Sequence, residues 1–83
     1  MKQITNANTA LKLLDEYVLI ASNYNIKRCF FVKSDDKILV INDNTKYYIS
    51  RNDFINDFYL FTFYVYKSFE EIDINQEFHT LRQ

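Results

Sequence analysis

The chain has 83 residues, a formal net charge of −1, and neither glycine nor proline. Phosphate-binding loops, dinucleotide fingerprints and nucleophile elbows all need glycine, for a positive φ angle or for close approach of the backbone to a ligand. The composition therefore excludes these enzyme motifs and favours one small domain, residues 1–83, that acts by contact with another molecule.

Cysteine and hydropathy indicate the compartment. Cys29 is the only cysteine and is followed by Phe30 and Phe31, so we expect a buried, inert thiol and no disulfide framework. The first residues are polar and do not form a secretory signal. The longest apolar run, residues 58–66, is far shorter than the roughly 20 residues of a membrane span. The sequence therefore predicts a cytoplasmic protein.

Residues 8–23 have the apolar spacing of a helix. Their apolar side chains recur at steps of three and four residues: Ala10, Leu11, Leu14, Tyr17, Val18 and Ala21. Thr5, Asn6 or Asn8 can cap the start by accepting a hydrogen bond from a free backbone N–H. Asn23 or Asn25 can end the helix in the left-handed conformation, which asparagine tolerates. We expect an N-terminal helix over this whole stretch.

Three β-rich runs follow, at residues 27–33, 37–42 and 46–50. The segments between them, 34–36 and 43–45, consist of Ser, Asp, Asn and Thr, which adopt turn geometries in place of glycine. Gaps of about three residues favour consecutive hairpins over crossover connections. The sequence therefore predicts a three-stranded antiparallel meander.

The chain after the meander contains further helix signals. Ser50 and Asp53 match a capping box, which predicts a helix from Arg51 that buries Phe54, Ile55 and Phe58. Residues 59–66 leave two interpretations: a helical stripe continues through them, whereas their aromatic residues favour a strand. We favour a short helix followed by a fourth extended segment.

A second capping box at residues 68–71 predicts a terminal helix with Phe69, Ile72, Phe78 and Leu81 on its apolar side. The predicted fold class is thus α+β, with an N-terminal helix, a three-stranded antiparallel meander, and one or two C-terminal helices.

Both faces of the meander are apolar. By alternation, one set contains Phe30, Val32, Ile38, Val40, Tyr47 and Ile49, and the other contains Cys29, Phe31, Leu39, Ile41 and Tyr48. An antiparallel sheet that is covered on one side normally has a polar outer face. We therefore expect the N-terminal helix to cover one face and the C-terminal half the other. The alternative is an exposed Tyr/Phe patch that binds another protein or a second copy.

No catalytic, metal or cofactor site is predicted. His79 is the only histidine and lacks converging partners, and Asp53 and Asp57 are one helical turn apart without further ligands. Nucleic-acid binding is an alternative, since five basic residues are interleaved with aromatics in the meander: Lys27, Arg28, Lys33, Lys37 and Lys46. They lie mainly at strand ends, where lysine guards against edge aggregation, and the pI near 5.7 is low for a dedicated binder.

The stretch from Leu39 to Ser50, Leu-Val-Ile-Asn-Asp-Asn-Thr-Lys-Tyr-Tyr-Ile-Ser, resembles the second hairpin of one inhibitor among the compact phage-encoded anti-CRISPR proteins. Glu70-Glu71 followed by Phe78 and Leu81 resembles the acidic helical end of the same inhibitor. The inhibitor is strongly acidic, whereas this chain is nearly neutral. The resemblance implies a phage or mobile-element antagonist of a host protein, such as a CRISPR effector nuclease, in the host cytoplasm.

These observations lead to one leading hypothesis, a non-enzymatic protein that inhibits a host protein through a Tyr/Phe surface bordered by acidic residues. The expected anchors are Tyr47, Tyr48, Tyr59, Tyr64 and Tyr66. The residues expected to steer a basic partner are Glu70, Glu71 and Asp73. The alternatives are a small nucleic-acid-binding regulator and a structural homodimer.

Overall fold

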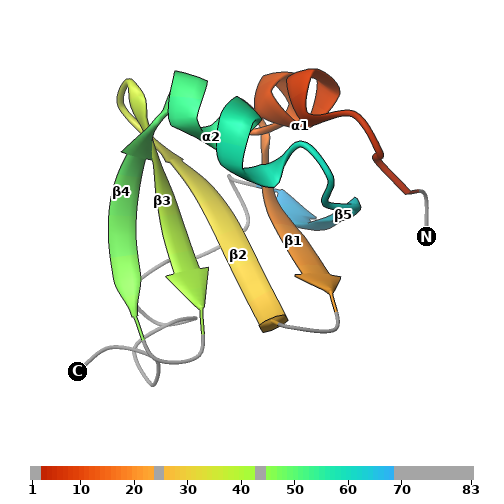
Figure 1. Ribbon diagram of the computed structural model, residues 1–83. Helices are drawn as coiled ribbons and strands as arrows, with labels where there is room; N and C mark the ends of the chain where they lie inside the picture. The colour runs from red at the N-terminus through yellow and green to blue at the C-terminus, as the bar shows by residue number, and fades with distance from the viewer. Residues whose placement is uncertain (1–2, 24–25, 43–44, 69–83) are drawn as a thin grey trace.

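The computed structural model describes residues 3–23, 26–42 and 45–68. These residues form α1 (Ala7–Leu13), β1 (Tyr17–Asn23), β2 (Ile26–Ser34), β3 (Lys37–Asn42), β4 (Lys46–Ser50), α2 (Arg51–Phe58) and β5 (Phe63–Ser68). The strands make one sheet in the order β4-β3-β2-β1-β5, and every neighbouring pair is antiparallel (Figure 1). The fold class is α+β as predicted, with more strands than the sequence indicated.

The N-terminal helix is half as long as expected. Asn6 caps α1, since its side-chain oxygen accepts hydrogen bonds from the backbone N–H groups of Asn8 at 2.8 Å and Thr9 at 3.2 Å. The helix ends at Leu13, however, and Asn23 belongs to β1 while Asn25 lies outside the described residues. The predicted helix over residues 8–23 is therefore wrong in its second half.

The reason for this error lies in β1. Its run Tyr17-Val18-Leu19-Ile20 is aromatic, β-branched or aliphatic at every position, and such a run fits a strand that is buried on both faces. As a central strand, β1 pairs with β2 on one side and β5 on the other. β2 follows β1 after two residues, whereas β5 lies about 40 residues further along the chain, so pairing with a distant segment helps to override the local helical spacing.

The predicted meander is confirmed as β2, β3 and β4. Ser34 pairs with Lys37, so Asp35 and Asp36 form a two-residue turn. Asp35 has φ 55°, in the left-handed region that Asp tolerates better than most residues. Thr45 closes the next connection by donating to the Asn42 side-chain oxygen from its N–H at 3.0 Å and its hydroxyl at 2.7 Å. Residues 43 and 44 lie outside the described residues.

The register corrects the expected division of side chains between the two faces. The predicted alternation within each strand is confirmed, but the prediction of which β2 side chains share a face with those of β3 and β4 is wrong. Phe31 pairs with Val40 and Phe30 pairs with Ile41, so Phe31, not Phe30, shares a face with Val40. The length of the turn at Asp35 fixes this pairing, and alternation alone cannot supply it.

The elements after the meander follow the favoured interpretation. Ser50 caps α2, since its hydroxyl accepts a hydrogen bond from the Asp53 N–H at 3.0 Å. Phe54 and Phe58 are buried and Ile55 is partly buried. The expected fourth extended segment is β5, at the edge of the sheet next to β1. The predicted terminal helix from residue 69 lies outside the described residues.

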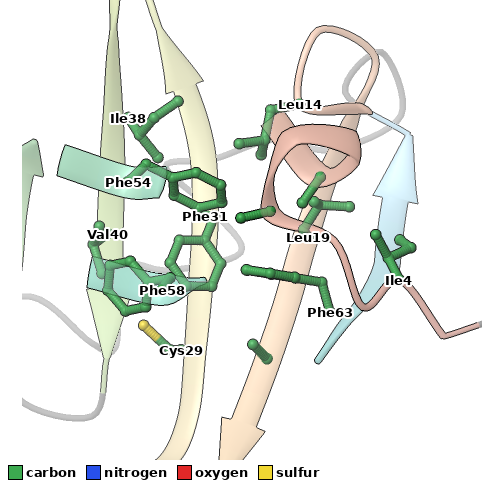
Figure 2. Packing of buried hydrophobic residues seen from close by; sticks show 13 residues of the cluster. Ile4, Leu14, Leu19, Cys29, Phe31, Ile38, Val40, Phe54, Phe58 and Phe63 are labelled. Carbon is green, nitrogen blue, oxygen red and sulfur yellow. The ribbon is translucent and has the colours of Figure 1, made fainter. Parts of the chain in front are cut away.

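Both described helices pack on one face of the sheet, which we call the first face. The buried cluster joins residues of α1 and α2 with residues of all three central strands (Figure 2). Phe31 lies at its centre, in edge contact with the rings of Phe54, Phe58 and Phe63 at centroid distances of 5.3, 5.0 and 5.4 Å. The expectation that the N-terminal helix and the C-terminal half take opposite faces is therefore wrong for α2, which joins α1 (Figure 1).

Candidate partner-binding surface

The large exposed apolar side chains of the described residues lie in two places. Tyr47 and Tyr48 are in β4, with exposed fractions of 42% and 60%. Tyr59 and Leu60 directly follow α2, with exposed fractions of 61% and 80%. We call the first pair the β4 surface and the second pair the α2 end. Because exposing large apolar side chains to water costs free energy, such places are candidates for contact with another molecule.

The β4 surface lies at an edge of the sheet. Among the described residues no strand pairs with the outer side of β4, so backbone N–H and C=O groups along that side are open to a further strand. Tyr47 pairs with Val40 and Tyr48 pairs with Leu39, so the two rings project from opposite faces of the edge strand. The neighbouring Lys46 is exposed, and a charge of this kind opposes unspecific edge pairing.

Tyr47 lies on the helix-covered side. Partial burial raises the pKa of its hydroxyl above the ordinary value, and the nearness of Cys29 and Asp57 raises the pKa further. Asp57 is exposed and belongs to the last turn of α2. Tyr47 therefore lies on the same side of the sheet as α2, with an acidic side chain close to it.

The α2 end lies on a turn that follows the helix directly. Tyr59 is the C-terminal cap of α2, and the chain then turns through a hydrogen bond from the Phe61 N–H to the Phe58 carbonyl at 3.0 Å. The Phe61 ring packs on Phe58 at 4.8 Å, which returns the chain to the core. Tyr59 and Leu60 occupy the outer side of this turn.

The other predicted anchors lie on the opposite edge of the sheet. Tyr64 and Tyr66 are in β5 and are partly buried. Tyr66 contacts Phe30 edge-on at 5.0 Å, and the Tyr64 hydroxyl accepts a hydrogen bond from the Gln3 side-chain amide at 3.2 Å. The sheet order thus separates the five tyrosines into two edges and the α2 end.

The predicted acidic residues Glu70, Glu71 and Asp73 lie outside the described residues. Leu60, in contrast, is highly exposed and was not singled out from the sequence. One signal was available: Leu60 falls off the helical stripe formed by Phe54, Phe58 and Phe61. A leucine off such a stripe, next to a helix end, is a candidate for exposure.

Four of the five predicted basic residues of the meander have described side chains, namely Arg28, Lys33, Lys37 and Lys46. Lys33 forms an ion pair with Asp15, with the Lys33 amine nitrogen 3.1 Å from a carboxylate oxygen. The Arg28 guanidinium lies 5.6 Å from the centre of the Phe30 ring. Lys37 and Lys46 are exposed near different ends of the neighbouring strands β3 and β4. Two of these four cations therefore already have a partner within the protein.

The described residues contain no group of three His, Cys, Asp or Glu side chains that could hold a metal ion. They also contain no buried side-chain nitrogen or oxygen without a hydrogen-bond partner. Cys29 is buried in the first-face cluster beside aromatic and aliphatic side chains (Figure 2). Such an apolar environment disfavours the charged thiolate form.

We expect the Cys29 thiol to be unreactive in the folded protein. Burial raises its pKa from the ordinary value of about 9 to about 12. At pH 8, a disulfide reagent should therefore modify native protein far more slowly than protein unfolded in urea. Fast modification of the native chain, at the rate of the unfolded chain, would contradict the buried position.

The same shift predicts how stability depends on pH. The unfolded thiol loses its proton near pH 9, whereas the folded thiol keeps it, so the free energy of unfolding falls as the pH rises from about 9 towards 12. A Cys29→Ala variant has no thiol at this position, so its free energy of unfolding should not show this contribution to the decrease at alkaline pH. Titrations of urea unfolding at several alkaline pH values, with both proteins, measure the difference.

Comparison with known proteins gave no match: no protein-family model, no curated protein and no solved structure matches the chain. None of the helices in residues 3–23, 26–42 and 45–68 is long and apolar enough to cross a membrane. The β4 surface and the α2 end are the features from which we infer a function.

Proposed function

We propose that the protein is a non-enzymatic binding protein that inhibits a host protein by direct contact. The observation that carries this proposal is the exposure of Tyr47 and Tyr48 on an edge strand, in a sheet whose other tyrosines are partly buried. Tyrosine is enriched at protein interfaces because its ring adds contact area with few rotatable bonds and its hydroxyl keeps a polar partner.

The edge position adds a second source of affinity. A partner strand that pairs with β4 would gain main-chain hydrogen bonds, while Tyr47 and Tyr48 would contact the partner on its two sides. Tyr59 and Leu60, which directly follow α2, would add a second apolar contact outside β4. Tyr64 and Tyr66 remain anchors of the opposite edge in this proposal.

Charge indicates the chemistry of the partner. Asp53 and Asp57 are exposed on α2, and the sequence continues with Glu70, Glu71 and Asp73. Carboxylates around an apolar contact attract a basic protein surface, such as the nucleic-acid-binding groove of a nuclease. Together with the resemblance of residues 39–50 to an anti-CRISPR hairpin, this makes a CRISPR effector nuclease the first partner to test.

The double variant Tyr47→Ala/Tyr48→Ala tests this proposal. We expect binding to the partner to weaken at least about 30-fold, because an aromatic residue at the centre of an interface contributes about 2 kcal/mol or more. The unfolding midpoint in urea should stay nearly unchanged, since both side chains are exposed. Titration calorimetry with a purified effector nuclease, and the cleavage activity of that nuclease, are the measurements.

Two further variants complete the design. Thr9→Ala, on the exposed side of α1, is the control that should bind like the natural chain. Tyr64→Ala/Tyr66→Ala tests the opposite edge. If a partner isolated from host lysate binds all tyrosine variants as tightly as the natural chain, the proposed contact is wrong.

Self-association through β4 is the second candidate, because an open edge strand can pair with the same strand of another copy. Light scattering over a range of concentrations measures it, and Tyr47→Ala/Tyr48→Ala should then shift a dimer towards the monomer. Nucleic-acid binding is checked by fluorescence polarisation at two salt concentrations, where salt-sensitive binding would favour the regulator hypothesis instead.

A further inference from the structure

The hydrogen-bonding direction of β4 follows from its connection to β3. The Asn42 N–H donates to the Thr45 carbonyl at 3.0 Å, so this pair occupies a hydrogen-bonded position of the antiparallel ladder. In such a ladder the hydrogen-bonded positions alternate with positions that are not bonded. Counting on from Thr45, Tyr47 and Ile49 therefore direct their backbone N–H and C=O groups towards β3.

The intervening residues direct theirs the other way. The backbone N–H and C=O groups of Lys46, Tyr48 and Ser50 point to the outer side of β4, with which no strand pairs among the described residues. The helix α2 begins directly after Ser50 and runs back across the sheet, where Phe54 contacts the ring of Phe31 in β2 (Figure 1). The helix therefore lies away from the outer side of β4.

We propose that β4 pairs with β4 of a second copy of the chain, antiparallel and centred on Tyr48. In this register the outward N–H and C=O groups of Tyr48 exchange hydrogen bonds with those of its own copy. Lys46 lies opposite Ser50, whose backbone groups also point outward, so the whole of β4 is paired. An antiparallel pair of identical strands has a two-fold axis, so the contact closes as a dimer and does not continue into a filament.

The side chains of β4 are compatible with this pairing. On the first face Tyr47 would lie opposite Ile49, and an aromatic ring opposite a β-branched side chain is a favourable cross-strand pair. On the other face the two Tyr48 rings would be neighbours, and each is 60% exposed in the single chain.

Charge favours the same register. Lys46 is the only charged residue in the sequence of β4, Lys-Tyr-Tyr-Ile-Ser. A register centred on Lys46 would place two cations opposite each other, which is destabilising. The register centred on Tyr48 places the two Lys46 side chains at opposite ends of the paired strands, and it is also the one that pairs β4 along its full length.

This dimer would regulate the proposed site, and in that respect the inference rests on the proposed function. The outer side of β4 can hold one strand, so a second copy and a host partner compete for it. The paired stretch is five residues long. Such a short contact is typical of a weak, reversible dimer. The dimer would therefore cover the β4 surface, and the monomer would present it.

Tyr48→Pro tests the pairing. Proline removes the outward N–H at the centre of the contact, and on the open side of an edge strand it leaves the bonds to β3 intact. We expect the dissociation constant of the dimer to rise at least about 10-fold, because each copy loses a donor. Sedimentation equilibrium at protein concentrations up to about 1 mM measures it. The matched control is Tyr59→Ala, an exposed tyrosine outside β4, which should dimerise like the natural chain.

A second measurement covers the case in which Tyr48→Pro does not fold. In the natural chain, amide hydrogen exchange should slow at Lys46, Tyr48 and Ser50 as the protein concentration rises. The amides of Tyr47 and Ile49 face β3, so their exchange should change little.

Three results would overturn the inference: a chain that stays monomeric at every concentration, a dimer that leaves exchange at Tyr48 unchanged, or a folded Tyr48→Pro variant that dimerises like the natural chain. None of them bears on contact with a host partner. Conversely, a dimer with slowed exchange at Tyr48 supports the inference even where no host partner binds, so the two proposals can fail separately.

Discussion

Replacing Phe31 with alanine is expected to lower the free energy of unfolding by about 3–5 kcal/mol, the usual cost of removing a fully buried phenylalanine ring. The reason is its position: the ring contacts Phe54, Phe58 and Phe63 at once and is fully buried. Alanine would leave a cavity between α2 and the sheet. A domain of this size has a stability of only about 4–12 kcal/mol, so this one change removes much of it.

Urea unfolding followed by far-ultraviolet circular dichroism measures this effect. The matched control is Phe61→Ala, because Phe61 is only partly buried and contacts the edge of the same aromatic group. Phe61→Ala should lower the free energy of unfolding clearly less than Phe31→Ala does. If Phe31→Ala does not fold, Phe31→Leu keeps most of the apolar volume and should show an intermediate loss. Equal decreases in the free energy of unfolding for Phe31→Ala and Phe61→Ala would show that the Phe31 ring is not central to the core.

Replacing Leu14 with alanine is expected to cost about 2–5 kcal/mol. Leu14 is the C-terminal cap of α1, its N–H donates to the Ala10 carbonyl at 3.1 Å, and its side chain is fully buried against the sheet. The packing of the Leu14 side chain in the core attaches α1 to the first face, just before the chain turns into β1. Alanine should therefore loosen the helix and leave a void in the core at the same time.

Leu60 provides a control with the same side chain and the opposite environment. It is 80% exposed, so Leu60→Ala should change the free energy of unfolding by no more than about 0.5 kcal/mol. The same urea titration compares the two variants. A small loss at Leu14 together with a large one at Leu60 would reverse the assignment of core and surface. Leu60→Ala is also informative for partner binding, because it alters the α2 end without disturbing the core.

Local sequence was sufficient where neighbouring residues make the structure. The strands β2 to β4 follow from alternation and from the Asp-rich and Asn-rich connections, and the caps at Asn6 and Ser50 follow from side chains that reach their own helix ends. Such contacts span two or three residues and need no knowledge of the rest of the chain. The extended segment β5 was also anticipated from its aromatic residues.

The candidate surface was predicted only in part. Tyr47 and Tyr64 are the same residue type in similarly aromatic strands, yet one is exposed beside the open edge and the other is partly buried and bonded to Gln3. Near Tyr66, β5 contains an irregularity: Val18 pairs with Lys67 and Leu19 with Val65, so Tyr66 is an extra residue that faces Phe30. A bulge of this kind has no local signature in the sequence.

The sequence by itself determined the fold class, the meander, the helix starts and the excess of apolar side chains that a single sheet face cannot bury. Only the tertiary structure decided that residues 17–23 form a strand, that both described helices share one face, and which tyrosines are exposed. The physical reason is the range of the interactions. Caps and turns depend on adjacent residues, whereas strand order, register and burial depend on pairings between distant segments, such as β1 with β5, and these compete with local propensity.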